Sequence, residues 1–487
     1  MTNEELLTLL DKIQSLKCET QTIELKAARG GCPQKLYDTL SSFSNQDDGG
    51  IIVFGVDEQN DYNECGIYDS QDIQRRIVEQ CKQMHPVVRP LLSVVEKDDK
   101  SFVSAEIPGI DISDRPCYYL GQGRLKGSYV RVGDSDEPMT EYEIYSYEAF
   151  RKKYQDDVRT VPRASFKSLD KVLLDEYVQR LKNEKPNLSN LDDEDIYELM
   201  SITHNNEITL SSVLLFCKYP QAYFPQLCIT AISLPSDEIG ETGPFGERFL
   251  DNQRIEGNIS QMLEQAILFI KRNIRTKTII NPTTGAREDR TDYPIAAIRE
   301  AILNTLVHRD YSIHTEGMPI QIIIYPNRIE IINPGGIYGR LKIDQLGKVQ
   351  PDTRNPVLAT ALEVLDVTEN RYSGIPTIRK AMSSYGLKEP VFMDRRGNFS
   401  VVLYNEPVEV SKEPIIDSLT KHEKSLLEFL KIQRSRKEIA EFLELSSTSY
   451  AIQTYITPLV ERGLVALTVP EKPKSHIQRY FSTIAKK

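Results

Sequence analysis

Two polar residues, Glu300 and Asn304, have the types and the spacing needed to hold a metal ion and a phosphate group. They lie four positions apart, so on a helix both side chains would face the same side. A carboxylate can orient a water molecule for attack on a γ-phosphate, and a carboxamide oxygen can bind a Mg²⁺ ion that bridges the phosphates. An ordinary solvated helix face produces the same pair, so its significance depends on what surrounds it.

Two glycine-containing turns follow this segment along the chain. One is Asn333-Pro334-Gly335-Gly336, after a β-branched run that predicts a strand, and the other lies within Asn370–Pro376 and contains Ser373 and Gly374. Glycines here would let backbone N–H groups approach a phosphate chain, although two ordinary tight turns would look the same. His308 and Arg309 could also contact phosphate, and an ion pair between Arg309 and Asp310 explains the arginine equally well.

Together these segments resemble the GHKL ATP-binding fold of gyrase-type topoisomerases and histidine kinases, and more closely its divergent version in transcriptional regulators once described as related to a DNA helicase. The resemblance gives Glu300 and Asn304 the positions of the family's helix motif, with Glu300 activating water if ATP is hydrolysed. Asn333–Gly336 takes the place of the first glycine box and Ser373–Ile375 that of the second. The resemblance implies a GHKL-type α/β sandwich over residues 291–406, with ATP and Mg²⁺ as cofactors.

One position departs from the family pattern. The usual first box begins with an aspartate that binds the adenine amino group, and this chain has Asn333 there. An asparagine carbonyl can still accept a hydrogen bond, so adenine can still be recognised. The departure favours nucleotide binding, with at most slow hydrolysis.

A second set of charged residues lies near the amino terminus. Glu24 and Lys26 are two apart in a predicted strand and share a face, and the run from Gly49 to Asp57 predicts a turn that leads into a buried strand. With Gly127–Gly133, this pattern resembles the Schlafen-type AlbA domain over most of residues 15–135, which implies an α+β domain.

The Schlafen resemblance leaves three interpretations of this domain. In animal Schlafen relatives, two glutamates and an aspartate form a metal-dependent RNA-cleaving site, and Glu19, Glu24 and Asp57 match those positions. Three carboxylates could hold Mg²⁺ or Mn²⁺. Alternatively, Glu24 and Lys26 form a structural ion pair and Asp57 is a turn residue, which is the interpretation we favour. A third, intermediate interpretation is that the domain binds nucleic acid or another protein without cleaving it.

The carboxy-terminal segment predicts a winged helix over residues 420–487. Two predicted helices, 435–446 and 447–462, precede two predicted strands with a basic tip. We favour DNA as the partner over protein, because this segment carries 12 Lys and Arg against seven Glu and no Asp. The candidate DNA contacts are Ser447, Thr448, Ser449, Tyr450, Gln453 and Thr454 on the second helix and Lys472, Lys474 and Arg479 on the wing.

Length, charge and cysteine content indicate the domain organisation and the compartment in which these sites work. A chain of 487 residues implies three or four domains, and its alternating predicted helices and strands indicate an α/β multidomain protein, which we divide at 1–150, 155–290, 291–406 and 420–487. The net charge of −11 confines DNA contact to the basic end. Seven scattered cysteines without a CxxC pair argue against a zinc site or a disulfide framework. The chain shows neither a signal peptide nor a membrane-spanning run, which predicts a cytoplasmic protein without a membrane partner.

The sequence therefore predicts an ATP-binding, DNA-binding transcriptional regulator whose conformation the nucleotide controls. The rival is a metal-dependent RNA nuclease that acts in defence, with the ATP module as a sensor, and a third possibility is a non-catalytic interaction scaffold. A homo-oligomer is expected, because GHKL folds often work as dimers and a winged helix that reads a two-fold DNA site needs a partner.

Overall fold

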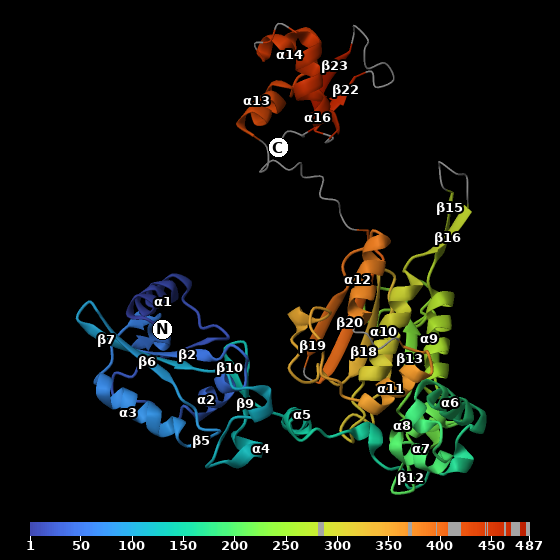
Figure 1. Cartoon of the computed structure of the whole chain (residues 1–487). Coiled ribbons are helices and arrows are strands. Elements are labelled where there is room, and N and C mark those ends of the chain that lie inside the picture. Colours follow the sequence, from blue (N-terminus) through green and yellow to red (C-terminus); the bar gives the residue numbers. More distant parts are fainter. Residues whose placement is uncertain are drawn as a thin grey trace. The chain divides into compact units, whose positions relative to one another are not determined.

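A computed structural model describes residues 1–280, 287–368, 373–395, 397–407, 420–443, 445, 447–461, 464–468 and 478–483 (Figure 1). The predicted sites Lys472 and Lys474, and Asn370–Tyr372 of the second glycine box, lie outside these ranges. The chain divides into two compact units, Met1–Pro407 and Val408–Lys487. All seven cysteines are free. No helix in the described ranges is long and apolar enough to cross a bilayer.

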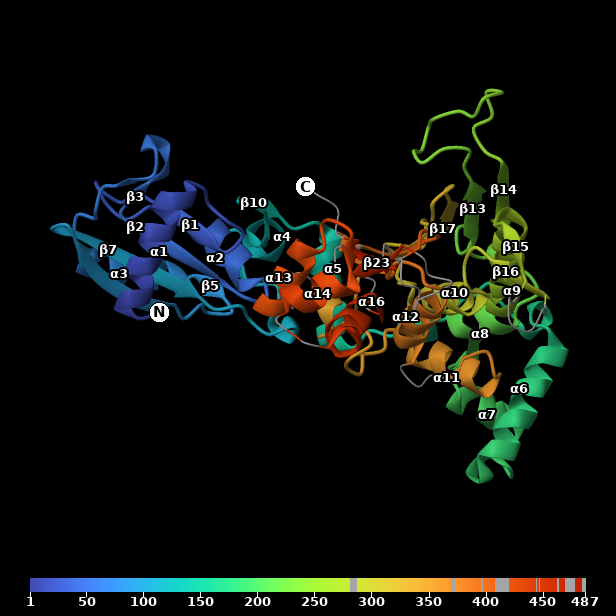
Figure 2. The same ribbon diagram turned by 90° about the horizontal axis from the view of Figure 1, so that it is seen from above.

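The amino-terminal part of the first unit is a four-stranded sheet in the order β1-β2-β7-β6, with β1 and β2 parallel and the other pairs antiparallel. Both faces are covered, because alternate residues of β2 point into different cores: Val53 packs with Leu6 and Leu10 of α1, and Ile52 packs with Leu40 of α2. Figure 2 shows these strands and helices from above. The bounds are α1 Asn3–Leu16, β1 Ile23–Lys26, α2 Tyr37–Ser44, β2 Gly50–Phe54, α3 Ser70–Cys81, β6 Leu91–Lys97 and β7 Lys100–Ile107.

Gly49 fixes the turn that starts β2. Its φ is +63°, and an added Cβ would overlap Ile107 O, so only glycine fits. Short elements complete this part of the chain. They are β3 Val56–Asp57, β4 Asn63–Glu64, β5 Met84–His85, η2 Ile112–Asp114, β8 Tyr118–Tyr119, α4 Gly123–Gly127, β9 Tyr129–Val132, β10 Ser135–Pro138 and α5 Glu141–Lys152.

The second sheet has six strands in the order β14-β13-β17-β18-β20-β19, and only β13 and β17 are parallel. Helices α9, α10 and α12 lie along one face (Figure 1). Helix α10 is central, so it is apolar nearly all round and buries eight of its residues. The bounds are β13 Ile229–Ser233, β14 Asp251–Ile255, α9 Ile259–Asn273, α10 Ile295–His308, β17 Ile320–Ile324, β18 Arg328–Pro334, α12 Gly374–Ser384, β19 Val391–Arg395 and β20 Asn398–Tyr404.

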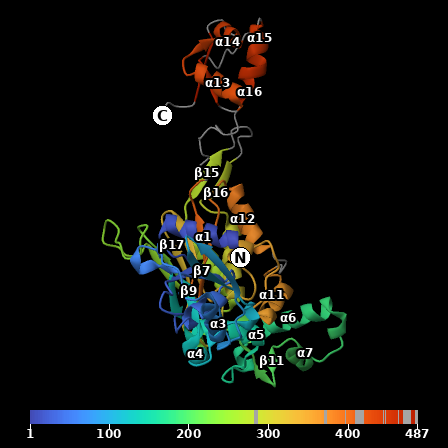
Figure 3. The same cartoon turned by 90° about the vertical axis from the view of Figure 1, so that its left-hand side faces the viewer.

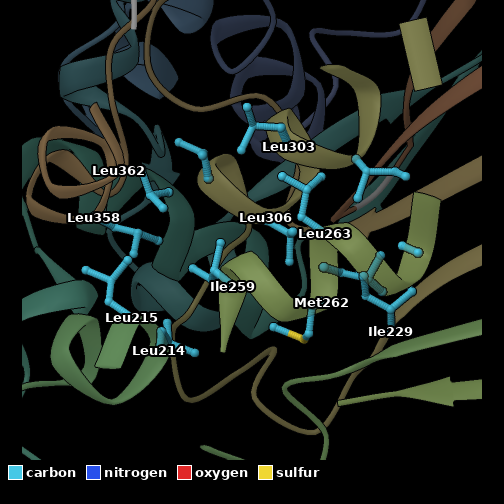
Figure 4. Close-up of a cluster of buried hydrophobic side chains, with 14 of the residues drawn as sticks. Leu214, Leu215, Ile229, Ile259, Met262, Leu263, Leu303, Leu306, Leu358 and Leu362 are labelled. Atoms are coloured by element: carbon cyan, nitrogen blue, oxygen red, sulfur yellow. The ribbon is translucent and has the colours of Figure 1, made fainter. Parts of the chain in front are cut away.

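One hydrophobic core joins this sheet to a helical region that precedes it. Leu214 and Leu215 of α8 belong to the same cluster as Leu303 of α10 and Leu358 of α11 (Figure 4). The carboxylate of Asp157 adds a polar link, because its Oδ2 accepts hydrogen bonds from the N–H groups of Val357, at 2.9 Å, and Leu358, at 3.2 Å, in the first turn of α11. The helices are α6 Lys171–Glu184, α7 Asp193–Leu199, α8 Leu210–Phe216 and α11 Pro356–Val364, and a β-ribbon of β15 Thr276–Ile280 and β16 Arg287–Thr291 extends from the sheet.

The sheet and its core run across the boundary that the sequence predicts at residues 290 and 291. Strands β13 and β14 and helix α9 precede that boundary, yet they supply one edge of the sheet and one helix of its covering layer. The predicted middle region is therefore divided in space: residues 229–273 complete the sheet, and α6, α7 and α8 pack beside it.

The second unit contains α13, α14, α15 and α16, which Figure 3 labels, and a small sheet in the order β21-β23-β22. Its core includes Leu426, Leu430, Ile439, Ile456 and Tyr480. The predicted helix 447–462 is not continuous, because a π-helical turn at Ile452–Ile456 separates α15 from α16. The bounds are α13 Lys421–Phe429, β21 Arg434–Ser435, α14 Arg436–Phe442, α15 Thr448–Ala451, α16 Thr457–Glu461, β22 Val465–Leu467 and β23 Arg479–Ser482.

Candidate functional site

A cavity of about 680 Å³ lies between α10, the end of β18, α12 and the loop that follows β18. Eight of the residues that the sequence predicts for nucleotide binding line it: Glu300, Asn304, His308, Asn333, Gly335, Gly336, Ser373 and Gly374. These residues come from elements far apart in the sequence. The structure therefore brings the predicted helix motif and both described glycine turns to one cavity.

Glu300 and Asn304 lie at the end of the cavity where α12 begins. The Asn304 side-chain Nδ2 donates to the Glu300 carbonyl oxygen at 2.9 Å and to Glu300 Oε1 at 3.0 Å. A Cβ on Gly374 would lie 2.6 Å from Asn304 Nδ2 and would overlap Glu300 Oε1, so this approach requires glycine. The first N–H groups of α12 are also here, and helix N-termini favour anions. This end can hold phosphate and a Mg²⁺ ion.

His308 lies two turns further along the same face of α10, about 12 Å from Glu300. Its ring is reached by solvent through the cavity but is surrounded by the cavity walls. This desolvation, followed by the positive charge of Arg354, lowers the pKa of His308 to about 4. The ring is therefore neutral at pH 7 and can donate or accept a hydrogen bond without carrying charge.

Asn333 lies near His308, since the backbone N–H of Asp310, just after α10, donates to the Pro334 carbonyl at 3.0 Å. Its side chain points to the helix-covered face of β18, the same face as Ile329 and Ile331, and the residue is 4% exposed. Its Oδ1 has no hydrogen-bond partner. A buried carbonyl oxygen without a donor is costly, and a bound ligand can supply that donor.

The loop after β18, which contains Gly335 and Gly336, is fixed by hydrogen bonds to Gly397 and Arg354. Gly335 has φ +102° and donates its N–H to the Gly397 carbonyl at 2.7 Å. Arg354 Nη2 donates to the Gly336 carbonyl at 3.1 Å, and Arg354 Nη1 lies 3.6 Å from Asp310 Oδ2. Burial alone would raise the pKa of Asp310, but Arg354, the Tyr142 hydroxyl and the Ser312 N–H hold it below its usual value. Nothing in the single sequence marked Arg354 or Tyr142 as part of this site.

Arg309 does not line the cavity, contrary to the prediction that it contacts phosphate. Its side chain is 1% exposed, and its guanidinium donates to the carbonyl oxygens of Thr315, at 3.1 Å, and Met318. The alternative ion pair with Asp310 is not formed either, because Asp310 pairs with Arg354. Since α10 ends at His308, the next side chain turns into the core.

The amino-terminal carboxylates are held by cations. Glu24, itself buried, accepts from Arg131 Nη2 at 2.8 Å and pairs with Lys26, and Arg131 also pairs with Asp136 at 3.0 Å. Glu19 lies 3.9 Å from Arg131. This arrangement matches the structural ion pair that the sequence analysis favoured. The described residues contain no group of three or more His, Cys, Asp or Glu side chains placed to hold a metal ion.

Asp57, the third carboxylate of the predicted nuclease site, lies on β3, whose backbone pairs with β4 at Asn63. No hydrogen bond or ion pair between described residues joins its side chain to Glu19 or Glu24. The structure therefore brings two of the three carboxylates to the same arginine, and the three together are not placed to hold a metal ion.

Glu19 offers a test of this site through pH. Desolvation raises its pKa to about 7, partly offset by the Leu25 N–H and reinforced by Glu24 and Glu58. Because the folded-state pKa exceeds the unfolded value, ionisation costs stability, and that cost grows as pH rises from about 4.5 to 7. We expect Glu19→Gln to gain on the order of 1–2 kcal/mol relative to wild type between pH 5 and pH 8. Denaturant unfolding at both pH values measures this gain, and parallel pH profiles would contradict it.

Those predicted DNA-contacting residues of the second unit that the structure describes are exposed. Ser447, Thr448, Ser449, Tyr450, Gln453 and Thr454 all reach solvent from α15 and the turn after it. Ser447 caps α15, since its hydroxyl accepts from the Tyr450 N–H at 3.3 Å. Arg479 is exposed on β23 and donates to the Gln433 carbonyl at 3.3 Å.

Comparison with known proteins identifies four segments. Residues 19–140 match the family described as "Schlafen, AlbA_2", and residues 317–403 match "Putative ATP-dependent DNA helicase recG C-terminal". Residues 422–483 match "Filamentation induced by cAMP protein Fic-like, C-terminal domain", and residues 147–230 match a domain of unknown function. No curated protein matches the chain.

Two solved structures show weaker likenesses. The DIP2311 protein from Corynebacterium diphtheriae is 15% identical, covers 98% of this chain and 97% of its own, and has a TM-score of 0.41. The N-terminal domain of a RecG-related protein from Nitrosomonas europaea is 26% identical over 27% of this chain and 92% of its own, with a TM-score of 0.23. Scores this low carry no weight for the fold. The two family matches support a RecG-related AlbA family, in which a Schlafen-type AlbA segment and an ATPase-like, nucleotide-binding segment share one chain.

Proposed function

We propose that the cavity binds ATP with Mg²⁺, and that the phosphates lie against Asn304 and the N-terminus of α12. The observation that carries the proposal is the meeting of Glu300, Asn304 and Gly374 at one end of the cavity, with the unpartnered carbonyl of Asn333 at the other. With Nδ2 of Asn304 engaged by Glu300, its Oδ1 is the atom available to Mg²⁺. The adenine amino group donates to Asn333 Oδ1.

Nucleotide binding, with at most slow hydrolysis, is the expected activity. Glu300 is the residue that would orient a water molecule, and its Oε1 accepts a hydrogen bond from Asn304. The carboxylate must leave that bond to act as a base, which adds to the barrier. The role of nucleotide binding is then to control the conformation of the protein.

Calorimetry on the full chain tests the proposal. We expect ATP to bind in the presence of Mg²⁺ and to bind more weakly in EDTA, with a matching rise in the thermal unfolding temperature because a ligand stabilises the state it binds. Wild-type protein that gives neither heat nor a thermal shift at millimolar ATP and Mg²⁺ would refute it.

Helix α5 contacts the wall of the cavity and can therefore transmit a change caused by the bound nucleotide to the rest of the first unit. The Tyr142 hydroxyl donates to Asp310 Oδ2 at 2.7 Å, and the Tyr142 ring lies where a Cβ on Gly397 would be. At the other end of α5, the Phe150 ring meets Tyr338 edge-on at 5.5 Å between centroids. Tyr142 therefore contacts Gly397 and Asp310, which both hold the loop from Gly335 to Tyr338 that forms one wall of the cavity. A nucleotide that moves this wall changes the packing of α5.

Removing the Tyr142 hydroxyl tests this route. We expect Tyr142→Phe to weaken ATP binding only about fivefold, the equivalent of one hydrogen bond, and to abolish the ATP-dependent change in hydrogen exchange across 141–152. Tyr145→Phe is the matched control, because the Tyr145 hydroxyl donates to Asp156 and not to this wall. Equal exchange changes in wild type and Tyr142→Phe would contradict the route.

We further propose that the second unit is a winged helix that binds DNA and that the protein regulates transcription as a homo-oligomer. The order of its helices and strands, its exposed polar helix and its excess of 12 Lys and Arg over seven Glu support this assignment. Residues 1–140 carry 15 Lys and Arg against 24 Asp and Glu, which disfavours nonspecific phosphate contact there. Fluorescence anisotropy on duplex DNA should show salt-dependent binding that Arg479→Ala weakens, and salt-independent binding would contradict it.

A further inference from the structure

The side-chain amide of Asn333 lacks a hydrogen-bond partner at both ends. Its Oδ1 is buried without a donor, and its Nδ2 makes no hydrogen bond to any residue that the structure describes. A carboxamide carries a two-lone-pair acceptor and two N–H donors on atoms of similar size. Because no hydrogen bond to a described residue fixes the amide, rotating it by 180° breaks none of these hydrogen bonds, and the torsion concerned is roughly two-fold.

The end of the cavity around Asn333 suits a neutral ring better than a phosphate. His308 is neutral at pH 7, since its pKa is lowered to about 4. The charge of Arg354 is engaged by Asp310 and by the Gly336 carbonyl. The groups suited to phosphate, namely Asn304, Gly374 and the N-terminus of α12, lie toward the other end, with Asn304 one turn and Glu300 two turns from His308 along α10.

We propose that Asn333 makes this site permissive for the group at position 6 of a purine, so that nucleotides with a 6-oxo group bind as well as those with a 6-amino group. A 6-amino group donates to Asn333 Oδ1. A 6-oxo group accepts from Nδ2 once the amide has rotated. An aspartate at this position could only accept, and would repel a 6-oxo group. The inference rests on nucleotide binding in this cavity and names the class of ligand as purine nucleoside triphosphates.

ATP and ITP are the probes, because inosine differs from adenosine at position 6 and lacks the 2-amino group that complicates guanosine. Full-length protein is titrated with each nucleotide and Mg²⁺ by calorimetry. We expect wild type to bind the two within about fivefold of each other. Asn333→Asp should raise the ATP preference by about tenfold or more, because a buried acceptor facing an acceptor leaves both unpaired.

Thr377→Asp is the matched charge control, since Thr377 lines the cavity at the end of the first turn of α12, near the phosphate end. The added carboxylate repels both triphosphates, so affinity falls for ATP and ITP together and their ratio stays that of wild type. Asn333→Ala removes donor and acceptor alike and should weaken both nucleotides similarly.

The possible outcomes distinguish failure of the permissive-site proposal from failure of the nucleotide-binding proposal on which it rests. Wild type that binds ATP but rejects ITP by a hundredfold or more overturns the permissive site and leaves ATP binding intact. An unchanged ATP-to-ITP ratio in a folded Asn333→Asp variant does the same. Wild type that binds neither nucleotide overturns both. If Asn333→Asp does not fold, the wild-type ratio alone decides.

Discussion

Asn304→Ala should lower the affinity for Mg²⁺ and ATP by about a hundredfold or more, since a metal ligand is lost together with its hydrogen bonds to Glu300. The change leaves the fold intact, because Asn304 is only partly buried and alanine favours helices. Calorimetry with ATP in Mg²⁺ measures the loss, and circular dichroism checks the helix content.

Two controls sharpen this result. In EDTA the difference in ATP affinity between wild type and Asn304→Ala should shrink to a fewfold, because the ion that Asn304 binds is absent. Asn252→Ala removes an exposed amide from β14, the opposite edge of the sheet, and should bind ATP as wild type does. A gap of equal size with and without Mg²⁺ would show that Asn304 does not bind the ion.

Gly335→Ala should be the most disruptive single change at the cavity. The residue has φ +102°, and an added Cβ would lie 2.5 Å from the Asp310 Cβ and overlap Arg354 Nη1. Neither neighbour can move freely, because Asp310 pairs with Arg354 and accepts from the Tyr142 hydroxyl, and Arg354 also donates to the Gly336 carbonyl. We expect a loss of about 2–4 kcal/mol, which lowers the transition temperature of the first unit by roughly 2–5 °C, together with loss of ATP binding.

Gly386→Ala separates backbone strain from crowding. Gly386 has φ +66° with nothing within 4 Å of an added Cβ, so its substitution costs only the strain of a left-handed alanine, about 1 kcal/mol. Scanning calorimetry compares the two variants. Equal falls in transition temperature would mean that the contacts behind Gly335 do not matter.

Local sequence patterns predicted the cavity wall on α10 and the glycine turns. Glu300, Asn304 and His308 repeat at a spacing of four, and that spacing alone puts them on one face of a helix. Gly335 and Gly374 were recognisable because few residues other than glycine permit such close approaches. These features depend on neighbours within a few residues, which is the range over which a single sequence is informative.

The parts that escaped prediction depend on contacts between distant segments. Tyr142 reaches Asp310 across 168 positions, and Asp157 reaches Val357 across 200. Arg309 looked like a phosphate ligand because it follows His308, but the end of α10 turns it into the core. The predicted boundary at 290 fell inside one sheet because β13 pairs with β17 across about 90 positions, and such distant strand pairing is not visible in local sequence patterns.

Strand order also has a consequence for how the chain folds as it is synthesised. The sheet β1-β2-β7-β6 is complete once residue 107 has emerged, so that part of the chain can form early. Strand β13, by contrast, must wait for β17, and β17 for β18 and β20, which ends at Tyr404. Until then α9 has only the hairpin of β13 and β14 to cover, and the rest of the sheet is missing. While some 170 further residues are synthesised, this half of the nascent chain therefore keeps apolar surface exposed, and chaperones bind such surface. Slowing translation between β13 and β17 should prolong this exposure and lower the yield of folded protein.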